Sequence, residues 1–167
     1  SLYTPIADGL SRKAGLRGAK LIANSLDSGR RHRDRGELAL GALLSGQAID
    51  AAGLSMHHVL SQTTVRVCGT PHAETNAAIL PVVMEEMRGR APEQIEALAD
   101  ALGTQPANLR GRIEALGGGR RGLAELGAER ACFEQVLDAA MARPELAQMT
   151  PGEVGRGDLA RVLDRAW

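Results

Sequence analysis

The composition and the spacing of apolar residues predict an all-α fold. Hydrophobic residues make up 44% of the 167 positions and are mostly Ala, Leu and Val, and Ala and Leu are strong helix formers. Strand-forming aromatic residues are scarce, with one Phe, one Tyr and one Trp. We therefore expect a helical, bundle-like domain that spans residues 1–167 as one unit.

The N-terminal half divides into three expected helices. Residues 5–27 carry apolar side chains at helical spacing, and five charges with two glycines then predict a loop over residues 28–36, where His32 would be exposed. Residues 37–52 form the next expected helix, and Gly53 interrupts it before a helix that carries His57 and His58. The helix over 37–52 is rich in small residues, as a buried central helix that approaches its neighbours closely must be: Gly41, Ala42, Ser45, Gly46, Ala48 and Ala52.

Prolines, glycines and capping residues divide the C-terminal half. Pro71 can start a helix through Val82 and Met87, in which Pro81 marks a kink or a boundary. Three later helices are expected over 92–102, from Thr104 or Asn108 to 116, and over 129–141, with Pro144 soon after the third. The last runs from Asp158, a good N-cap residue, to about Arg165. The glycines at 117–119 form a turn, because no strand precedes them and no Lys-Ser/Thr follows, as a phosphate loop requires.

The charge and the cysteines exclude several classes of partner. With 20 basic and 20 acidic residues, the formal charge of zero favours neither nucleic acid nor an anionic membrane. No apolar run approaches the roughly 18 residues of a membrane helix. Cys68 and Cys132 lie far apart in the sequence, which suits reduced thiols and a cytoplasmic location better than a disulfide framework.

Two histidines, His58 and His72, form the candidate site. They lie fourteen positions apart, and His72 falls in the first turn of the helix that Pro71 starts. The free N–H groups of that turn depress a histidine's pKa, and a neutral imidazole is the form that binds a metal. On spacing alone, the pair fits buried, hydrogen-bonded structural histidines as well as metal ligands. His57 points about 100° away from His58 and cannot bind the same ion.

At these positions the chain resembles the iron-containing alcohol dehydrogenases, and within them the maleylacetate reductases. The shared segments are Gly53–His58, which ends in two histidines, Pro71–Thr75, which reads Pro-His-Ala-Glu-Thr, and Leu80–Pro81. The family fold that the resemblance implies is an N-terminal dinucleotide-binding α/β domain followed by an all-helical metal-binding domain. The likeness covers essentially all 167 residues, but only the helical half of such an enzyme.

The resemblance also implies roles for individual residues. His58 and His72 correspond to two of the four metal ligands, whereas the other two, an aspartate and a histidine one turn apart, would precede the segment over residues 1–5 and are absent. Family members commonly carry a further histidine, lining the nicotinamide and substrate pocket, where this chain has Gln62. Gln62 is thus the candidate catalytic position. An amide cannot titrate near neutral pH, so the proton route or the substrate of this protein would differ from those of family members with histidine there.

The implied function is reduction of a small keto acid, with maleylacetate the leading candidate, by NAD(P)H and a divalent metal (iron or zinc) in the complete protein. The dinucleotide-binding domain or subunit would be the missing partner, so we expect this chain alone to bind metal weakly and to be inactive in hydride transfer. We also expect self-association, or docking of the missing half, through an apolar face near Leu2, Tyr3 and Ile6. The alternative is a standalone domain without redox chemistry that acts as a binding or interaction module or as a metal-free enzyme.

Overall fold

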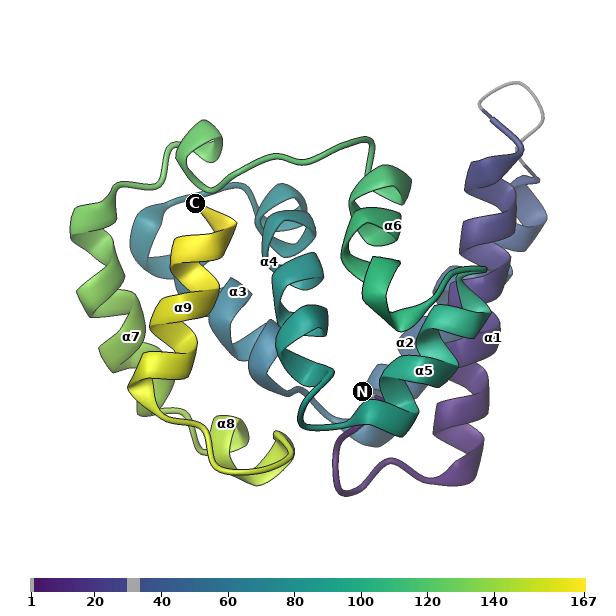
Figure 1. Cartoon of the computed structure of the whole chain (residues 1–167), viewed down its shortest axis with the longest axis horizontal. Coiled ribbons are helices and arrows are strands. Elements are labelled where there is room, and N and C mark those ends of the chain that lie inside the picture. Colours follow the sequence, from purple (N-terminus) through teal and green to yellow (C-terminus); the bar gives the residue numbers. More distant parts are fainter. Residues whose placement is uncertain (1, 30–33) are drawn as a thin grey trace.

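The computed structural model describes residues 2–29 and 34–167, and this part of the chain is helical without a strand (Figure 1). The first four helices are α1 (Gly9–Asp27), α2 (Arg35–Ala52), α3 (Met56–Cys68) and α4 (His72–Met87). The later helices are α5 (Pro92–Ala101), α6 (Leu109–Leu116), α7 (Phe133–Met141), α8 (Pro144–Met149) and α9 (Arg156–Ala166), with short 3₁₀ turns at Pro106–Asn108, Ala124–Leu126 and Arg130–Cys132. The all-α expectation is confirmed.

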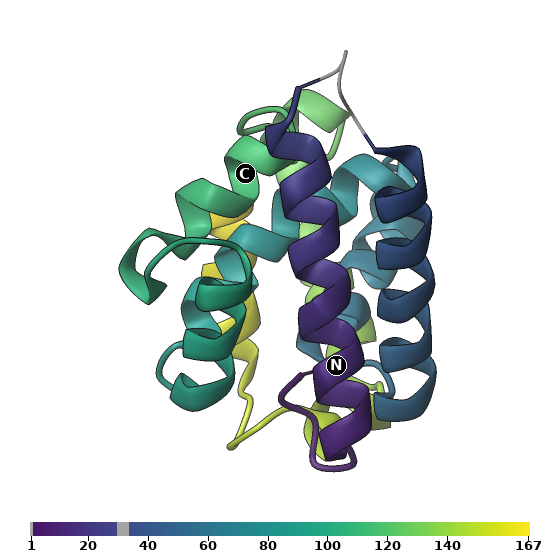
Figure 2. The same cartoon turned by 90° about the vertical axis from the view of Figure 1, so that its right-hand side faces the viewer.

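Helix α4 occupies the centre of the arrangement. It packs against α3 and α9 on one side and against α5 and α6 on the other (Figure 1). The hairpin of α1 and α2 stands at one end of the molecule, and α7 stands at the opposite end, beside α9 (Figures 1 and 2). The buried face of α4 includes Ile79, Val82 and Val83, which belong to the main hydrophobic core. The histidines of α3 and α4 therefore lie on helices that the rest of the fold holds from several sides.

The small residues of α2 allow a close approach to α1, as expected. A Cβ atom at Gly18 of α1 would lie 2.8 Å from the carbonyl oxygen of Gly41, so only glycine fits there. However, α2 is not the buried central helix that its small residues suggested. The side chains of Leu40 and Leu43 are 42% and 59% exposed, because α2 packs chiefly on α1 at the edge of the fold.

Several helix boundaries differ from the expected ones, and local capping explains two of them. Helix α1 starts at Gly9 rather than at residue 5, because the Asp8 carboxylate accepts a hydrogen bond from the Ser11 N–H group at 2.7 Å and caps the helix there. Helix α9 starts at Arg156, and Asp158 lies in its first turn, where its carboxylate accepts from the Gly155 N–H group at 2.8 Å. Asp158 thus acts from inside the helix and is not the N-cap residue.

Other expectations on the elements had mixed outcomes. Helix α4 continues through Pro81 to Met87, so Pro81 is not a helix boundary. The expected helix over 129–141 begins as a 3₁₀ turn before α7, and α8 was not expected at all. Part of the expected loop over 28–36, including His32, lies outside the described residues.

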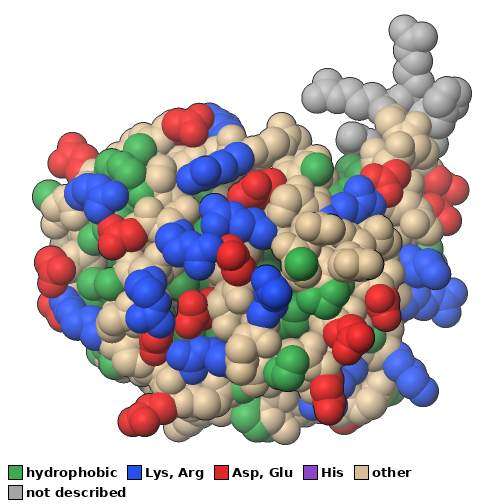
Figure 3. Space-filling view, viewed as in Figure 1, with side chains coloured by type: hydrophobic (Ala, Val, Ile, Leu, Met, Phe, Trp, Pro, Cys, Tyr) green, Lys and Arg blue, Asp and Glu red, His purple; other side chains and the backbone are tan. Residues whose placement is uncertain are grey.

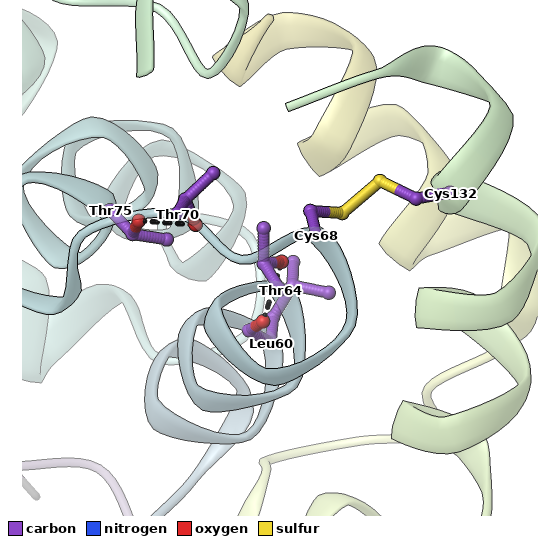
Figure 4. The surroundings of a disulfide bond; sticks show 6 residues. All are labelled: Leu60, Thr64, Cys68, Thr70, Thr75 and Cys132. Atoms are coloured by element: carbon purple, nitrogen blue, oxygen red, sulfur yellow. Dashed lines mark hydrogen bonds between the residues drawn. A yellow bond between two sulfur atoms is a disulfide. The ribbon is translucent and has the colours of Figure 1, made fainter. Parts of the chain in front are cut away.

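A disulfide bond joins Cys68, at the end of α3, to Cys132, just before α7 (Figure 4). The expectation of reduced thiols is therefore wrong. The sequence separation of 64 does not keep the two residues apart in space, since α3 packs on α7 and brings their Cα atoms to 5.9 Å. The cytoplasmic location stays a prediction, and this bond is the feature that argues against a strongly reducing compartment.

None of the described helices is by itself long and apolar enough to cross a membrane. The pair α2 and α3 meets the length and composition criteria only when taken together, and a bend of 99° separates them.

Candidate functional site

The hairpin of α3 and α4 positions the candidate histidines. Gly69 ends α3 with a left-handed backbone (φ 70°), and α4 begins at His72 directly after Pro71. The Thr75 hydroxyl lies 2.6 Å from the Pro71 carbonyl oxygen and 2.8 Å from the Thr70 hydroxyl, which fixes this first turn (Figure 4). The expectation that His72 lies in the first turn of a helix is thus confirmed.

His57 has a structural role in this hairpin. It is buried, and its Nε2 atom lies 3.2 Å from the carbonyl oxygen of Asn76 on α4. Asn76 also accepts a hydrogen bond at Oδ1 from the Ser61 hydroxyl, at 2.9 Å. Burial, and secondly the charge of His58, lower the pKa of His57 to about 3. A neutral His57 therefore links α3 to α4, and it is not presented to a ligand.

His58 is half-buried and differs from its neighbour in its surroundings. Burial is the largest influence on it, and together with nearby charges that include His72 it lowers the pKa of His58 to about 4. His58 is thus neutral at neutral pH and suited to metal binding, and His72 is exposed at the start of α4.

A cavity of about 240 Å³ adjoins His57 and His58. Its other walls come from the N-terminal segment and from α1, α2, α4 and α5: Leu2, Tyr3, Gly15, Ser45, Ile49, Leu80, Met84, Gln94, Ile95 and Leu98. Among the described residues its walls include neither His72 nor Gln62. The cavity is mostly apolar, so a ligand in it would be partly removed from water beside the His58 imidazole.

The N-terminal segment only partly forms the expected apolar face. Ile6 is 54% exposed, as expected, and so is its neighbour Leu10 at 78%. Tyr3 is buried, contrary to expectation, and burial raises its pKa to about 12 although a hydrogen bond with Ser55 acts in the opposite direction. Tyr3 therefore belongs to the wall between the N-terminal segment and α3, and Leu2 beside it is half-buried.

Gln62 lies on α3, one turn after His58, and is half-buried. Its Oε1 atom accepts a hydrogen bond of 2.9 Å from Nη1 of Arg143, which precedes α8. Arg143 also forms an ion pair of 2.9 Å with Glu145. The sequence did not indicate Arg143, because a single arginine before a proline belongs to no motif, and only the packing of α8 against α3 brings it to Gln62.

The donor set fits part of a metal site. His58 and His72 supply two imidazoles, and among the described residues no group of three or more His, Cys, Asp or Glu side chains could hold a metal ion. The Cys68 sulfur is engaged in the disulfide bond and does not add a thiolate ligand. Glu74 lies in the first turn of α4, where its negative charge interacts favourably with the helix dipole. It lines a cavity other than the one beside His58. A complete metal site therefore needs ligands beyond those that the described residues bring together.

The comparison with known families identifies the class of protein. Residues 3–167 match the family described as "Fe-containing alcohol dehydrogenase family, C-terminal". The chain therefore belongs to the iron-containing alcohol dehydrogenase family and corresponds to its C-terminal helical domain.

Individual relatives refine this assignment. Maleylacetate reductase 1 of Rhodococcus opacus is 29% identical over 174 residues, covering 100% of this chain and 47% of the relative. The crystal structure of maleylacetate reductase from Agrobacterium tumefaciens aligns with a TM-score of 0.86 and 28% identity, covering 99% of this chain and 48% of that one. The crystal structure of an iron-containing alcohol dehydrogenase from Corynebacterium glutamicum aligns with a TM-score of 0.88 and 25% identity, covering 99% of this chain and 47% of that one. The chain spans about a third to a half of the length of the curated relatives it matches.

Proposed function

We propose that this chain is the metal- and substrate-binding domain of an NAD(P)H-dependent reductase for a small keto acid, with maleylacetate the leading candidate. The observation that supports this most is His58, a half-buried and neutral imidazole beside an apolar cavity, on α3 of the hairpin whose second helix, α4, begins at His72. The names of the relatives support the substrate, since several are maleylacetate reductases. The resemblance of the Pro71–Thr75 segment points the same way.

In this proposal His58 and His72 hold a divalent metal, iron or zinc, together with two ligands from the missing part of the protein. When bound, the metal would supply Lewis acidity toward the carbonyl oxygen of the substrate. The burial of His58 keeps its imidazole unprotonated, and the cavity wall beside it limits the access of water. His57 contributes indirectly, by fixing α3 to α4 through Asn76.

Gln62 would orient the substrate and would not transfer a proton. Its Oε1 atom is engaged by Arg143, which leaves the Nε2 amide group as a hydrogen-bond donor. A donor one turn from His58 suits a carbonyl or carboxylate oxygen. The proton that completes the reduction must therefore come from another group or from water.

The rest of the enzyme would be a dinucleotide-binding domain or subunit that packs against residues 1–167, which we propose to be a single helical domain. The exposed side chains of Ile6 and Leu10 mark a surface for that contact. The nicotinamide would then meet the substrate in the cleft between the two parts. The same apolar surface would lead the isolated chain to self-associate.

The test is to assay the complete protein, with its upstream residues, by the oxidation of NAD(P)H with maleylacetate and a panel of other keto acids and aldehydes. His58→Ala and His72→Ala should remove bound metal and activity together. Glu74→Gln is the matched control beside His72 and should retain both. If the complete protein binds neither metal nor nicotinamide, the proposal is wrong and the interaction module takes its place.

A further inference from the structure

A second cavity, larger than the one at His58, lies between α1, α4, α5 and α6. Its volume is about 470 Å³, within the range of sites that bind small molecules. Most of its wall is apolar and includes Ile22, Leu26, Leu80, Leu98, Leu102 and Ile113. The wall shares Ser45, Leu80, Met84 and Leu98 with the cavity at His58, but His57 and His58 do not line it.

Four arginines line this second cavity, and they differ in their partners. Arg110 and Arg165 both form ion pairs with Glu85, and Arg110 is also paired with Glu114 at 3.1 Å. Two others, Arg120 and Arg121, are exposed and form no ion pair with any described residue. On the face drawn in Figure 3, Lys and Arg side chains gather near the middle among scattered acidic ones.

The loop that carries the two unpaired arginines brings them to the edge of the cavity. Gly118 and Gly119, which follow the C-cap residue Gly117 of α6, adopt positive φ angles of 90° and 111°, and the cavity lining includes Gly119, Arg120 and Arg121. The cavity thus combines an apolar interior with cationic groups at its edge. An apolar body gains free energy by leaving water for the apolar wall, and a carboxylate at the edge can pair with guanidinium groups that form no ion pair with any described residue.

We propose that this second cavity binds an amphipathic carboxylate, with its apolar body between α4 and α6 and its carboxylate on Arg120 and Arg121. Guanidinium groups bind carboxylates through two parallel hydrogen bonds, so the charge supplies selectivity and the apolar wall supplies affinity. Glu74 and Glu114 also line the wall. Their negative charges disfavour a second anionic group on the ligand, so the ligand carries a single carboxylate.

The test compares naphthalene-2-carboxylate with its neutral counterpart naphthalene-2-carboxamide, titrated into the protein by calorimetry. The carboxylate should bind about tenfold more tightly or better, since hydrogen bonds to charged groups are the stronger ones. Methyl NMR spectra of the unmodified protein should show shifts at Ile22 and Ile113 during the titration. Equal binding of the two compounds, no binding, or shifts confined to other methyl groups would overturn the proposal.

Variants separate the two parts of the site. Arg120→Gln combined with Arg121→Gln should weaken binding of the carboxylate by about tenfold and leave the affinity for the carboxamide unchanged. The control, Arg17→Gln combined with Arg88→Gln, removes two arginines outside the cavity and should change neither of the two affinities. Ala19→Phe, which fills the cavity from α1, should remove binding of both compounds. Because no turnover is measured, these results do not depend on the reductase proposal.

Discussion

Nη1 of Arg143 donates a hydrogen bond of 2.9 Å to Oε1 of Gln62 and so links the start of α8 to α3, one turn from His58. This bond determines whether the Gln62 amide can donate or accept a hydrogen bond with a ligand. An amide whose oxygen is already engaged can only donate to a ligand, whereas a free amide can turn and offer either atom.

Replacing Arg143 by Met should therefore weaken substrate orientation without removing metal. In the complete protein we expect kcat/KM for the keto acid to fall about tenfold, the usual scale for one lost hydrogen bond to a charged group, with the metal content unchanged. Glu145→Gln is the control, because it removes the negative charge of the other partner of Arg143 and leaves the bond to Gln62. Steady-state kinetics with metal analysis makes the measurement, and equal effects of the two variants would contradict this role.

The contact between α1 and α2 predicts opposite effects of Ala at two glycines. A Cβ atom at Gly18 would lie 2.8 Å from the Gly41 carbonyl oxygen and 2.6 Å from the Ser45 hydroxyl, so Gly18→Ala must push the helices apart. We expect a loss of about 1–3 kcal/mol in the free energy of unfolding. Gly46 is a helical glycine with no atom within 4 Å of an added Cβ, and Gly46→Ala should instead gain about 0.5–1 kcal/mol. Urea unfolding of both variants is the measurement, and a stable Gly18→Ala protein would refute the close contact.

The sequence predicted most of the fold because the decisive signals are local. Ala and Leu at helical spacing predicted the helices, and Pro71 predicted that His72 lies in the first turn of a helix, as it does in α4. Local capping was harder to read, since Asp8 and not Pro5 starts α1. The edge position of α2 was missed because small residues indicate close packing on one neighbour as readily as burial among several.

The parts of the site that the sequence could not predict depend on contacts between distant elements. Arg143 reaches Gln62 only because α8 packs on α3. Cys68 and Cys132 meet only because α3 packs on α7, and neither contact leaves a periodic or spaced pattern in the sequence. His57 and His58 are adjacent in sequence, but only the fold shows that one binds the Asn76 carbonyl and the other adjoins a cavity.

Removing the disulfide bond should destabilise the domain substantially. A cross-link that closes a loop of this length (64 positions) restricts the unfolded chain by about 4 kcal/mol in the chain-entropy treatment. Reduction, or Cys68→Ser combined with Cys132→Ser, should lower the urea midpoint accordingly. Reductant should have no further effect on the double variant, which serves as the control. An unchanged midpoint on reduction would show that the bond does not form in solution.

The buried Tyr3 predicts a loss of stability at high pH. A tyrosine phenol in water has an ordinary pKa of 10.0, and burial raises the pKa of Tyr3 to about 12 in the folded protein. Below pH 10 the phenol is neutral in both the folded and the unfolded protein, so its ionisation does not change the free energy of unfolding. Between pH 10 and about 12 the unfolded chain releases this proton first, which favours unfolding by up to roughly 3 kcal/mol.

Tyr3→Phe isolates this contribution, because it keeps the ring and removes the ionising group. At pH 8 the variant should be less stable than the parent protein by about 1 kcal/mol, since it loses the hydrogen bond with Ser55. As the pH rises toward 12, the parent should lose stability relative to the variant, until the order of the two urea midpoints reverses. Both cysteines are in the disulfide bond, so no free thiol titrates in this range. Parallel curves for the two proteins from pH 8 to pH 12 would mean that Tyr3 is exposed in solution, and that the N-terminal segment does not pack against α3.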